Sequence, residues 1–384
     1  MKPLISIGIN LIAWRSEKLS GAGKYMQRLF RAMQSEDTSR YAFTVYLQQG
    51  IDPSIFCIPD TPSFRIVRVP RLGNPFVRML FEQTLFRFYI RKCDAMFSPL
   101  PTNPLWGDWK NIITIHDLVW YFYPNRLSFF KRLHAQVVPR FIARKADQIV
   151  TVSENSRNDI VAVHGVAQDK INVVYNFILP DEPVLSDEPG ETGGVTIRMT
   201  DGREITFTGP YFLSVSSLQP HKNIRRLLEA FDLFRAANPG YKLCIVGDEV
   251  RNYRELYDFT KERGLTESVV FTGYLDDCAL GRLYTHCTAT VYISLYEGFG
   301  IPPLEGFYHG KTCVVSGISS LPEVVGRAGI YVDPYDAGSI AKGLETCLRN
   351  GKEYTPYIGE QIAKFQPGAQ IEKLFHLFGT IHSK

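Results

Sequence analysis

The amino-acid sequence predicts an α/β protein with two doubly wound parallel sheets, in two Rossmann-like domains that face each other across a cleft. Short apolar runs alternate with helical stretches along the chain, a pattern typical of parallel sheets covered by helices. The length of 384 residues suits two domains of ordinary size. An acidic segment rich in Pro and Gly, residues 181–209, separates two such alternating series.

The first series extends from the N-terminus to about residue 180. Its apolar runs are, in order, LISIGINLI, FTVYL, FRIVRV, AMFSP, NIITIHD and QIVTVS. Helical stretches are predicted between them at Lys24–Met33, Val77–Arg91 and Phe129–Lys145. Residues 1–180 are therefore predicted to form an N-terminal Rossmann-like domain.

The second series begins near Tyr211. Its apolar runs are YFLSVSS, YKLCIVGD, SVVFTGY, ATVYISL, TCVVSG and GIYVD, and its helical stretches are Asn223–Ala237, Arg254–Arg263, Cys278–Thr285 and Pro303–His309. Residues 210–365 are predicted to form a second Rossmann-like domain. The stretch VTIRMTDGREITF alternates around Asp-Gly, which predicts a small hairpin within a linker at 181–209. Residues 366–384 are predicted to form a helix that returns to the N-terminal domain.

Composition excludes several classes of protein. Hydrophobic residues make up 45% of the chain, which supplies real cores and argues against a disordered chain. No apolar stretch approaches the roughly 20 residues of a membrane span, and the N-terminus has the pattern of a buried strand without a signal-peptide cleavage site. The seven cysteines form no CxxC pair, which indicates free buried thiols in a reducing cytosol. We therefore expect a cytoplasmic protein.

Positive charge is concentrated in one part of the chain. Residues 64–146 contain fourteen Lys or Arg against four acids, whereas the whole chain has a net charge of only +4. Within this region, FFKRLHAQVVPRFIARK mixes apolar and basic residues, as helices on anionic membranes do. We expect peripheral contact with an anionic membrane through residues 65–146, with an ordinary solvated helix as the alternative. A nucleic-acid partner is not expected, because no recognised motif is present.

The stretch SLYEGFGIPPLEGF is the first candidate site. In open parallel sheets, ligands bind at the carboxyl ends of strands, and Glu297 follows the predicted strand ATVYISL. Gly298 and Gly300 are expected to adopt positive φ and to allow close approach of a ligand. The Pro-Pro pair suits a helix start, and Glu305 is predicted in the first turn, whose free N–H groups favour phosphate. The alternative is that Glu305 only stabilises the start of its own helix.

Three further stretches carry candidate residues. Lys222 stands at a predicted helix start in SVSSLQPHKNIRRLLEAF, where its charge could neutralise a phosphate and Asn223 could be the N-cap. His116 ends the strand NIITIHD, and either points toward a ligand or hydrogen-bonds a neighbouring loop. The loop Gly21-Ala22-Gly23 lacks the third glycine of a dinucleotide fingerprint, so it does not support a nicotinamide cofactor.

These motifs, in this order, resemble those of the family 4 retaining glycosyltransferases, which have the GT-B architecture. The most specific match is EGFGIPPLE, followed by SGISSLPEVVGRAGIYVDP. Supporting matches are GAGKY, TIHD, VTVSENSRNDI, PHKN and VVFTGYLDD. The resemblance covers nearly the whole chain and is strongest toward bacterial O-antigen and polysaccharide mannosyltransferases.

The resemblance implies a role for each matching residue. Lys222 would bind the diphosphate of a nucleotide-sugar donor, Glu305 would hydrogen-bond its ribose, and Glu297 would hold the donor sugar. His116 would contact that sugar from the opposing, acceptor-side domain. The backbone at residues 270–271 would border the base, and Glu323 would line the outer site. The remaining donor-site positions implied by the resemblance are Gly23, Ser217, Asn223, Val270, Phe271, Gly298, Phe299, Gly300, Ile301 and Leu304.

One departure from the family concerns charge. Ser217 stands where the family often has Arg, so neutralisation of a diphosphate would depend on Lys222 and helix N-termini, with help from Arg225 or Arg226. No metal-binding Asp-x-Asp is evident, and Asp276-Asp277 is predicted to cap a helix, so neither a metal nor another cofactor is expected. The family retains anomeric configuration, with the leaving phosphate taking the acceptor proton, so Glu297 is not assigned as a nucleophile.

The expected function is transfer of a hexose, mannose from GDP-mannose as the first choice, onto a lipid-linked or polysaccharide acceptor in cell-surface glycan synthesis. The enzyme would be cytoplasmic, or peripheral at the inner face of the plasma membrane. One alternative is a sugar-nucleotide epimerase or phosphorylase of the same fold. Another is a catalytically inactive sugar-nucleotide binder, which Ser217 favours. The sequence leaves open the acceptor, the linkage, the oligomeric state and the interdomain angle.

Overall fold

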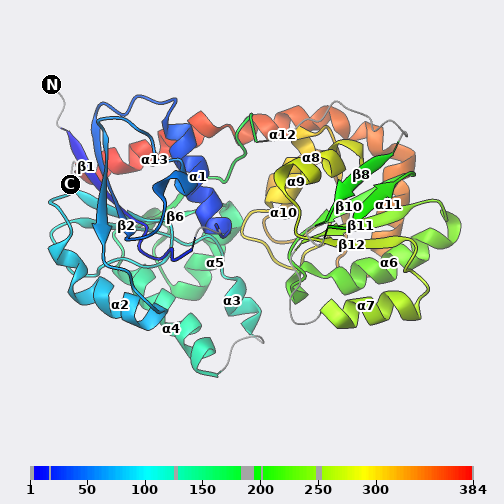
Figure 1. Ribbon diagram of the computed structural model, residues 1–384, viewed down its shortest axis with the longest axis horizontal. Coiled ribbons are helices and arrows are strands. Elements are labelled where there is room, and N and C mark those ends of the chain that lie inside the picture. Colours follow the sequence, from blue (N-terminus) through cyan, green and yellow to red (C-terminus); the bar gives the residue numbers. More distant parts are fainter. Residues whose placement is uncertain are drawn as a thin grey trace. The chain divides into compact units, whose positions relative to one another are not determined.

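The computed structural model describes residues 4–16, 19–124, 129–182, 194–199, 202–247 and 253–382. The chain divides into two compact units (Figure 1), the first formed by residues 1–177 and 365–384 and the second by residues 178–364. Each unit contains a parallel sheet with helices packed against it. The predicted α/β class with two Rossmann-like sheets is therefore confirmed.

The sheet of the first unit has seven parallel strands. Their order is β3 (Phe64–Val69), β2 (Tyr41–Gln48), β1 (Ile5–Asn10), β4 (Ala95–Ser98), β5 (Lys110–Thr114), β6 (Gln148–Thr151) and β7 (Ile171–Val173). The helices of this unit are α1 (Gly21–Met33), α2 (Pro75–Thr84), α3 (Val119–Phe122), α4 (Phe129–Lys145), α5 (Glu154–His164) and α13 (Pro367–His382), with 3-10 turns η1 (Pro53–Phe56), η2 (Phe86–Phe88) and η4 (Gln168–Lys170). The strand order reverses between β1 and β4, which is where such sheets bind ligands.

The last helix, α13, belongs to the first unit although it ends the chain. It packs against α1, β1 and β4. The phenolic hydroxyl of Tyr41 donates a 3.0 Å hydrogen bond to the carbonyl of Phe375, and the two rings lie 4.6 Å apart. The first unit is therefore built from both ends of the chain.

The sheet of the second unit has six parallel strands. Their order is β12 (Val269–Gly273), β11 (Lys242–Val246), β10 (Tyr211–Val215), β13 (Ala289–Tyr292), β14 (Cys313–Ser316) and β15 (Gly329–Val332). The helices are α6 (Ile224–Ala237), α7 (Tyr253–Glu262), α8 (Asp277–His286), α9 (Ile301–Tyr308), α10 (Leu321–Val325), α11 (Ala337–Asn350) and α12 (Ile358–Lys364), and the 3-10 turn η5 (Pro220–Lys222) precedes α6. Here the order reverses between β10 and β13.

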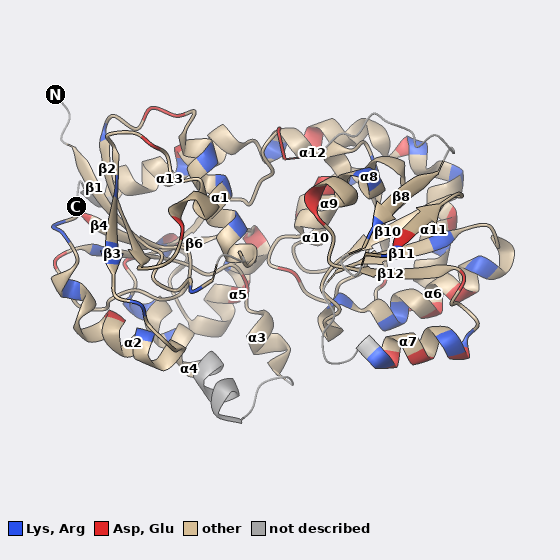
Figure 2. Ribbon diagram, viewed as in Figure 1, with Lys and Arg blue, Asp and Glu red and all other residues tan. Residues whose placement is uncertain are grey.

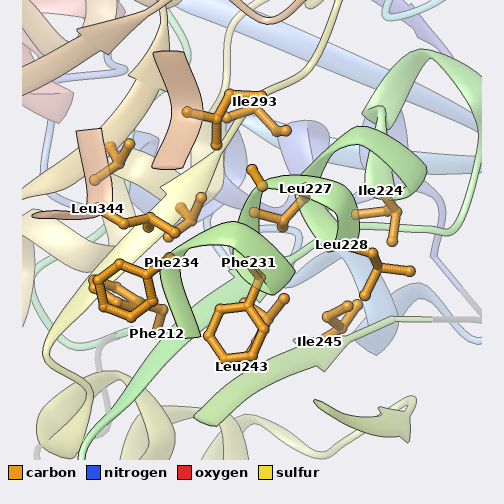
Figure 3. Close-up of a cluster of buried hydrophobic side chains, with 14 of the residues drawn as sticks. Phe212, Ile224, Leu227, Leu228, Phe231, Phe234, Leu243, Ile245, Ile293 and Leu344 are labelled. Carbon is orange, nitrogen blue, oxygen red and sulfur yellow. The ribbon is translucent and has the colours of Figure 1, made fainter. Parts of the chain in front are cut away.

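Helix α6 shows how the second unit's core forms. Its apolar residues recur at helical spacing, and Figure 3 shows Leu227, Phe231 and Phe234 pointing from α6 toward the sheet. They pack with Phe212 of β10 and Leu243 of β11, and all five side chains are fully buried. Burying each such side chain stabilises the fold by about 1.5–3 kcal/mol, which fixes α6 on the sheet. The turn that begins α6 is thereby held at the end of β10.

The predicted hairpin is present as strands β8 (Val195–Arg198) and β9 (Glu204–Phe207), which pair antiparallel. Its alternate residues Val195, Ile197 and Phe207 are buried in one cluster with residues of β10, β11 and α8. The hairpin is therefore part of the second unit's core and not of a separate linker, because its apolar face needs cover. Residues 183–193 of the predicted linker lie outside the described residues.

Two further observations concern the class of protein. Among the described residues, no helix combines the length and the apolar character needed to cross a membrane. All seven cysteines are free, as predicted. Five of them are buried, but Cys278 is exposed at the start of α8, so the expectation of burial fails there.

Candidate functional site

The candidate site of the second unit lies at the reversal of its strand order. Lys222 is in the turn η5 that follows β10, and Glu297 is in the loop that follows the neighbouring strand β13. The carboxyl ends of β10 and β13 are adjacent, so the two loops meet. This crevice is the usual ligand position in doubly wound sheets.

Lys222 and Glu297 form a nearly buried ion pair. The ammonium Nζ lies 2.5 Å from Oε1 of Glu297, and the two side chains are 13% and 11% exposed. Nζ also donates a 3.0 Å hydrogen bond to the hydroxyl of Tyr292, the last residue of β13. An ammonium has three N–H groups, and within the described part of the chain these two bonds use two of them. One N–H of Lys222 therefore stays available to a ligand.

The pair keeps both side chains charged. Burial alone would raise the pKa of Glu297, but the Lys222 charge and its hydrogen bond hold that pKa below the ordinary value. Burial opposes the charge of Lys222, but the Glu297 carboxylate more than offsets it and raises the Lys222 pKa. The two charges cancel each other, so an anionic ligand would compete with Glu297 for Lys222.

Two serines hold the backbone of the Glu297 loop. Ser319 Oγ accepts a hydrogen bond from the Glu297 amide at 3.0 Å and lies 2.9 Å from the Glu297 carbonyl. Ser320 Oγ donates to the carbonyl of Phe299 at 2.8 Å. Ser319 has φ of 59°, a left-handed conformation that is uncommon for serine. The loops after β13 and β14 are thus fastened together beneath the ion pair.

The glycine turn leads directly into α9. Gly300 is the N-cap with φ of 108°, and a Cβ there would meet Leu321 Cδ2 at 2.7 Å, so the position requires glycine. Gly298 does not adopt positive φ, contrary to our expectation. The two prolines at the second and third helical positions have no N–H. The helix start can therefore offer an anion the amides of Gly300 and Ile301, fewer than the sequence suggested.

Glu305 lies in the second turn of α9 and not in the first, because the helix begins at Ile301. Its carboxylate Oε2 accepts a 2.8 Å hydrogen bond from the hydroxyl of Tyr284 in α8. The Tyr284 ring is stacked on His309 with centroids 5.3 Å apart. Glu305 is thus oriented by a buried tyrosine that is itself held by a neighbouring ring.

Several predicted donor-site residues can act only through their backbone. The side chains of Phe299 and Leu304 are buried in the core, with exposures of 4% and 0%. Val270 and Phe271 lie inside β12 and not at its carboxyl end, and their side chains belong to two different apolar clusters. Their predicted place near a nucleotide base stays a prediction.

Asn223 occupies the N-cap position of α6 but does not cap it through its side chain. It has φ of 60°, and its amide donates to the carbonyls of Pro334 at 2.7 Å and Ile293 at 3.3 Å. Asn223 therefore links the end of η5 to the loops after β13 and β15. Ser217 lies in the same β10–η5 loop, at intermediate exposure.

The two arginines expected to assist Lys222 are engaged elsewhere. The guanidinium of Arg225 lies 3.9 Å from the Phe259 ring centroid and its Nε is 3.2 Å from Glu229. Arg226 lies 3.6 Å from the same carboxylate. Figure 2 shows α6 and α7 with bands of both charges, typical of a solvated helix surface. The assistance from Arg225 or Arg226 is not supported by these contacts.

His116 lies in the first unit, just after β5. Its Nε2 is 2.9 Å from the carbonyl of Pro99, and its ring meets Tyr25 edge-on at 4.9 Å. Burial lowers the His116 pKa to about 4, so the ring is neutral at physiological pH. Because a carbonyl can only accept, Nε2 carries the hydrogen and Nδ1 presents a lone pair. The ring has the loop contact that we considered as an alternative, and can still accept a bond from a hydroxyl.

Gly23 lies in the first turn of α1, and its amide donates to the N-cap Ser20. A Cβ at Gly23 would meet Leu19 and the Trp14 indole at 2.9 Å each, so packing alone explains this glycine. In the second unit, Glu323 is in the first turn of α10. The predicted cap at Asp276 is confirmed, because its carboxylate accepts from the Ala279 amide at 2.7 Å.

Comparison with known proteins matches both halves of the chain to glycosyltransferase families. The family model described as Glycosyltransferase Family 4 matches residues 19–182, and the model described as Glycosyl transferases group 1 matches residues 202–364. The structure of HepE from Anabaena in complex with UDP and glucose has a TM-score of 0.72 at 16% identity, covering 98% of this chain and 100% of that chain. The chain therefore belongs to the glycosyltransferases of the GT-B fold.

Among curated relatives, the serotype-specific mannosyltransferase WbdA of Escherichia coli is 26% identical over 287 residues, 72% of this chain and 34% of WbdA. O-antigen chain mannosyltransferase B of Escherichia coli is 31% identical over 249 residues, 63% of this chain and 62% of that protein. The chain thus aligns with less than two thirds of the length of either relative.

Sequence reasoning missed the residues that support the site. Tyr292, Tyr284, Ser319 and Ser320 contact Lys222, Glu305 or the Glu297 loop through the fold. Tyr292 lies in the middle of the predicted run ATVYISL, and only the structure shows that β13 ends there, so the sequence did not mark its hydroxyl as a strand-end group. The serines lie in SGISSLPE, which the family resemblance had already marked without giving them a role.

Proposed function

We propose that this protein is a retaining glycosyltransferase that moves a hexose from a nucleotide sugar onto a lipid-linked or polysaccharide acceptor. The main support is the Lys222–Glu297 pair at the strand-order reversal, together with the amides of Gly300 and Ile301 at the start of α9 and Glu305 on that helix. Mannose from GDP-mannose is the first choice of donor, because the relatives WbdA and O-antigen chain mannosyltransferase B are named mannosyltransferases. The proposed setting is cytoplasmic synthesis of a cell-surface glycan.

The chemistry follows from the charge that develops in glycosyl transfer. The bond between the anomeric carbon and the diphosphate oxygen breaks, and its electron pair remains on that oxygen. The free N–H of Lys222 and the amides of Gly300 and Ile301 would stabilise this charge, as preorganised donors do. The acceptor oxygen then bonds to the anomeric carbon on the same face, and its proton passes to the leaving phosphate oxygen.

Glu297 has a different role in this proposal. Its Oε1 already accepts from Lys222, which makes it a poor nucleophile and a good holder of that ammonium. Because Ser217 brings no positive charge, a bound diphosphate would rely on Lys222 and helix amides. We expect the reaction to need neither a metal ion nor another cofactor, since these groups supply the stabilisation.

The test is transfer from a panel of GDP-, UDP-, dTDP- and ADP-sugars, with a membrane extract as the source of acceptor. One donor should release nucleotide only when the extract is present, with undiminished rate in EDTA and with the product keeping the donor's anomeric configuration. Conversion of the donor into another sugar nucleotide, with no net nucleotide release, would favour an epimerase of the same fold. Binding of a donor with no turnover under any condition would favour an inactive sugar-nucleotide binder.

A further inference from the structure

Helix α2 of the first unit is apolar on its outward side. Phe76 and Leu80 are 69% and 56% exposed and stand one helical turn apart, so they project from the same side. The opposite side of α2 is buried through Phe81 and Glu82. A helix that buries one side normally presents polar residues on the other. Large apolar side chains on the exposed side therefore need a partner outside the unit.

The apolar surface continues into the turn η2. Phe88 is 72% exposed there, the highest exposure among the large apolar side chains of the described residues. We define the α2 patch by its exposed apolar residues, which are Phe76, Val77, Leu80, Leu85 and Phe88. The exposed basic residues that flank it in the sequence are Arg71, Arg87, Arg91 and Lys92.

The region of the α2 patch carries no exposed negative charge of its own. Between residues 64 and 93 the sequence has seven Lys or Arg and one acid, Glu82. Glu82 is 1% exposed, and its oxygens accept from Asn10 at 2.6 Å and Thr102 at 2.5 Å. The carboxyl group therefore anchors α2 to the end of β1 and leaves the outer surface basic and apolar. This anchor also makes the patch a fixed surface.

We propose that the α2 patch docks the protein on an anionic lipid bilayer. Phe76, Leu80 and Phe88 would enter the boundary between headgroups and acyl chains, where apolar faces of interfacial helices lie. The basic residues would meet anionic headgroups. Charge complementarity favours this partner, because the surface combines exposed aromatic rings with positive charge, and residues 64–93 contribute no exposed acid to it.

Two other helices of the first unit support the same partner. Helix α3 exposes Trp120 and Tyr121, 48% and 40%, and these residue types are enriched at membrane–water interfaces. Helix α4 packs against α3 and exposes Val137 and Phe141 beside basic residues. In Figure 1, α2, α3 and α4 all lie in the lower part of the first unit. The sequence predicted membrane contact for the stretch 129–145. The side chains of residues 129–136 lie outside the described residues, so the proposal depends on the α2 patch.

The test is co-sedimentation of the full chain with vesicles of phosphatidylcholine alone and of equal parts phosphatidylcholine and phosphatidylglycerol. Binding is expected only to the anionic vesicles and should weaken as salt rises. The triple change Arg87→Gln, Arg91→Gln and Lys92→Gln should lower the partition constant about a hundredfold. The triple change Phe76→Ser, Leu80→Ser and Phe88→Ser should lower it by at least about tenfold.

Matched controls lie in the second unit. Leu233 and Tyr335 are 57% and 60% exposed, so Leu233→Ser with Tyr335→Ser removes comparable apolar surface and should leave binding unchanged. The exposed basic residues Lys342, Arg349 and Lys352 give the control for charge when all three are changed to Gln. Thermal unfolding confirms that each variant is folded.

The variant Phe88→Trp gives a direct signal of insertion. The fluorescence emission of the new tryptophan should shift to shorter wavelength when anionic vesicles are added. The proposal is overturned if the wild type does not bind anionic vesicles, or if the apolar triple variant binds them with the same partition constant as the wild type. It is also overturned if the wild type self-associates through the patch and does not bind vesicles, because the patch would then be a protein interface. None of these readouts needs turnover, so docking and the proposed transferase activity fail or succeed separately.

Discussion

The ammonium of Lys222 lies 2.5 Å from a carboxylate oxygen of Glu297, although the two residues are separated by the whole of β11, β12 and β13 in the chain. Their loops meet because β10 and β13 are neighbours in the sheet. The contact links the two loops and holds Lys222 in place, with one of its N–H groups left for a ligand. Substitutions should therefore affect stability and function together.

Lys222→Met should lower the free energy of unfolding by about 3–5 kcal/mol at pH 7, because it leaves the Glu297 carboxylate buried without its cation. Urea denaturation measures this. Lys342→Met, on the exposed side of α11, is the matched control and should stay within about 0.5 kcal/mol of the wild type. Adding Glu297→Gln to Lys222→Met should recover part of the loss, and a purely additive double variant would contradict the pairing.

The loss of unfolding free energy in Lys222→Met should depend on pH. In the wild type the pKa of Glu297 lies below its ordinary value of 4.5, so its stabilising contribution is present above pH 4.5 and is lost as the pH falls further. Without Lys222, the main cause that lowers the pKa of Glu297 is lost, and burial, the largest contribution, raises that pKa. The difference in unfolding free energy between wild type and Lys222→Met should therefore be smaller at pH 5 than at pH 7. An equal difference at both values would mean that Glu297 is not charged in the folded protein.

The buried His164 and the half-buried His116 and His309 should make the protein sensitive to mild acid. Burial lowers the pKa of His116, His164 and His309 from 6.5 to about 4. Since the unfolded chain binds these protons first, stability is fully present above pH 6.5 and is lost as the pH falls toward 4. Urea denaturation at several pH values should show this slope.

His164→Leu tests that interpretation. The ring is 1% exposed, and within the described part of the chain neither ring nitrogen has a hydrogen-bond partner. The variant should keep the wild-type stability at pH 7 to within about 1 kcal/mol and reduce the slope by up to about 1.4 kcal/mol per pH unit. An unchanged slope would show that His164 is not buried neutral in solution.

Gly300→Ala should damage the turn that begins α9. Its φ of 108° disfavours a side chain, and the new Cβ would lie 2.7 Å from Leu321. We expect a loss of about 1–3 kcal/mol in unfolding free energy and weaker donor binding. Gly310→Ala is the control, because Gly310 also has positive φ, at 68°, but an added Cβ meets nothing within 4 Å. Equal effects of the two variants would remove the steric argument.

Tyr284→Phe should act on the donor through Glu305. It removes the 2.8 Å hydrogen bond that orients the Glu305 carboxylate without touching Lys222. The loss of one such bond corresponds to about 0.5–1.5 kcal/mol, so KM for the donor should rise by up to about tenfold with kcat little changed. The exposed Tyr335→Phe is the control, and steady-state kinetics with the donor found in the panel is the measurement. A fall in kcat at constant KM would argue against a role for Glu305 in binding.

The sequence was sufficient for the sheets and for the principal charged residues. The predicted apolar runs match twelve of the thirteen strands in the two parallel sheets, and only the short β7 (Ile171–Val173) was missed. They were sufficient to show that Lys222 and Glu297 each follow a strand. Their meeting depends on β10 lying beside β13, which is a property of the sheet order and not of spacing in the chain. No strand order was predicted from the sequence, so only the structure shows that the two loops meet.

The missed features share one cause, because each depends on contacts between distant segments. Tyr284 reaches Glu305 from α8, and Asn223 turns from its helix to bind the carbonyl of Pro334. The proline pair suits a helix start, but neither Pro302 nor Pro303 has an N–H to offer an anion there. Arg225 was a plausible helper by sequence, but an available ring and carboxylate hold it elsewhere.

The most direct test of the proposed site is acceptor-dependent nucleotide release by wild type, Lys222→Met and the control Lys342→Met. We predict that Lys222→Met loses about a hundredfold to a thousandfold in rate, the usual effect of removing one preorganised group that stabilises a leaving charge. The control should keep the wild-type rate. A folded Lys222→Met protein that releases nucleotide as fast as the wild type would contradict the assignment of the Lys222–Glu297 pair as the diphosphate site.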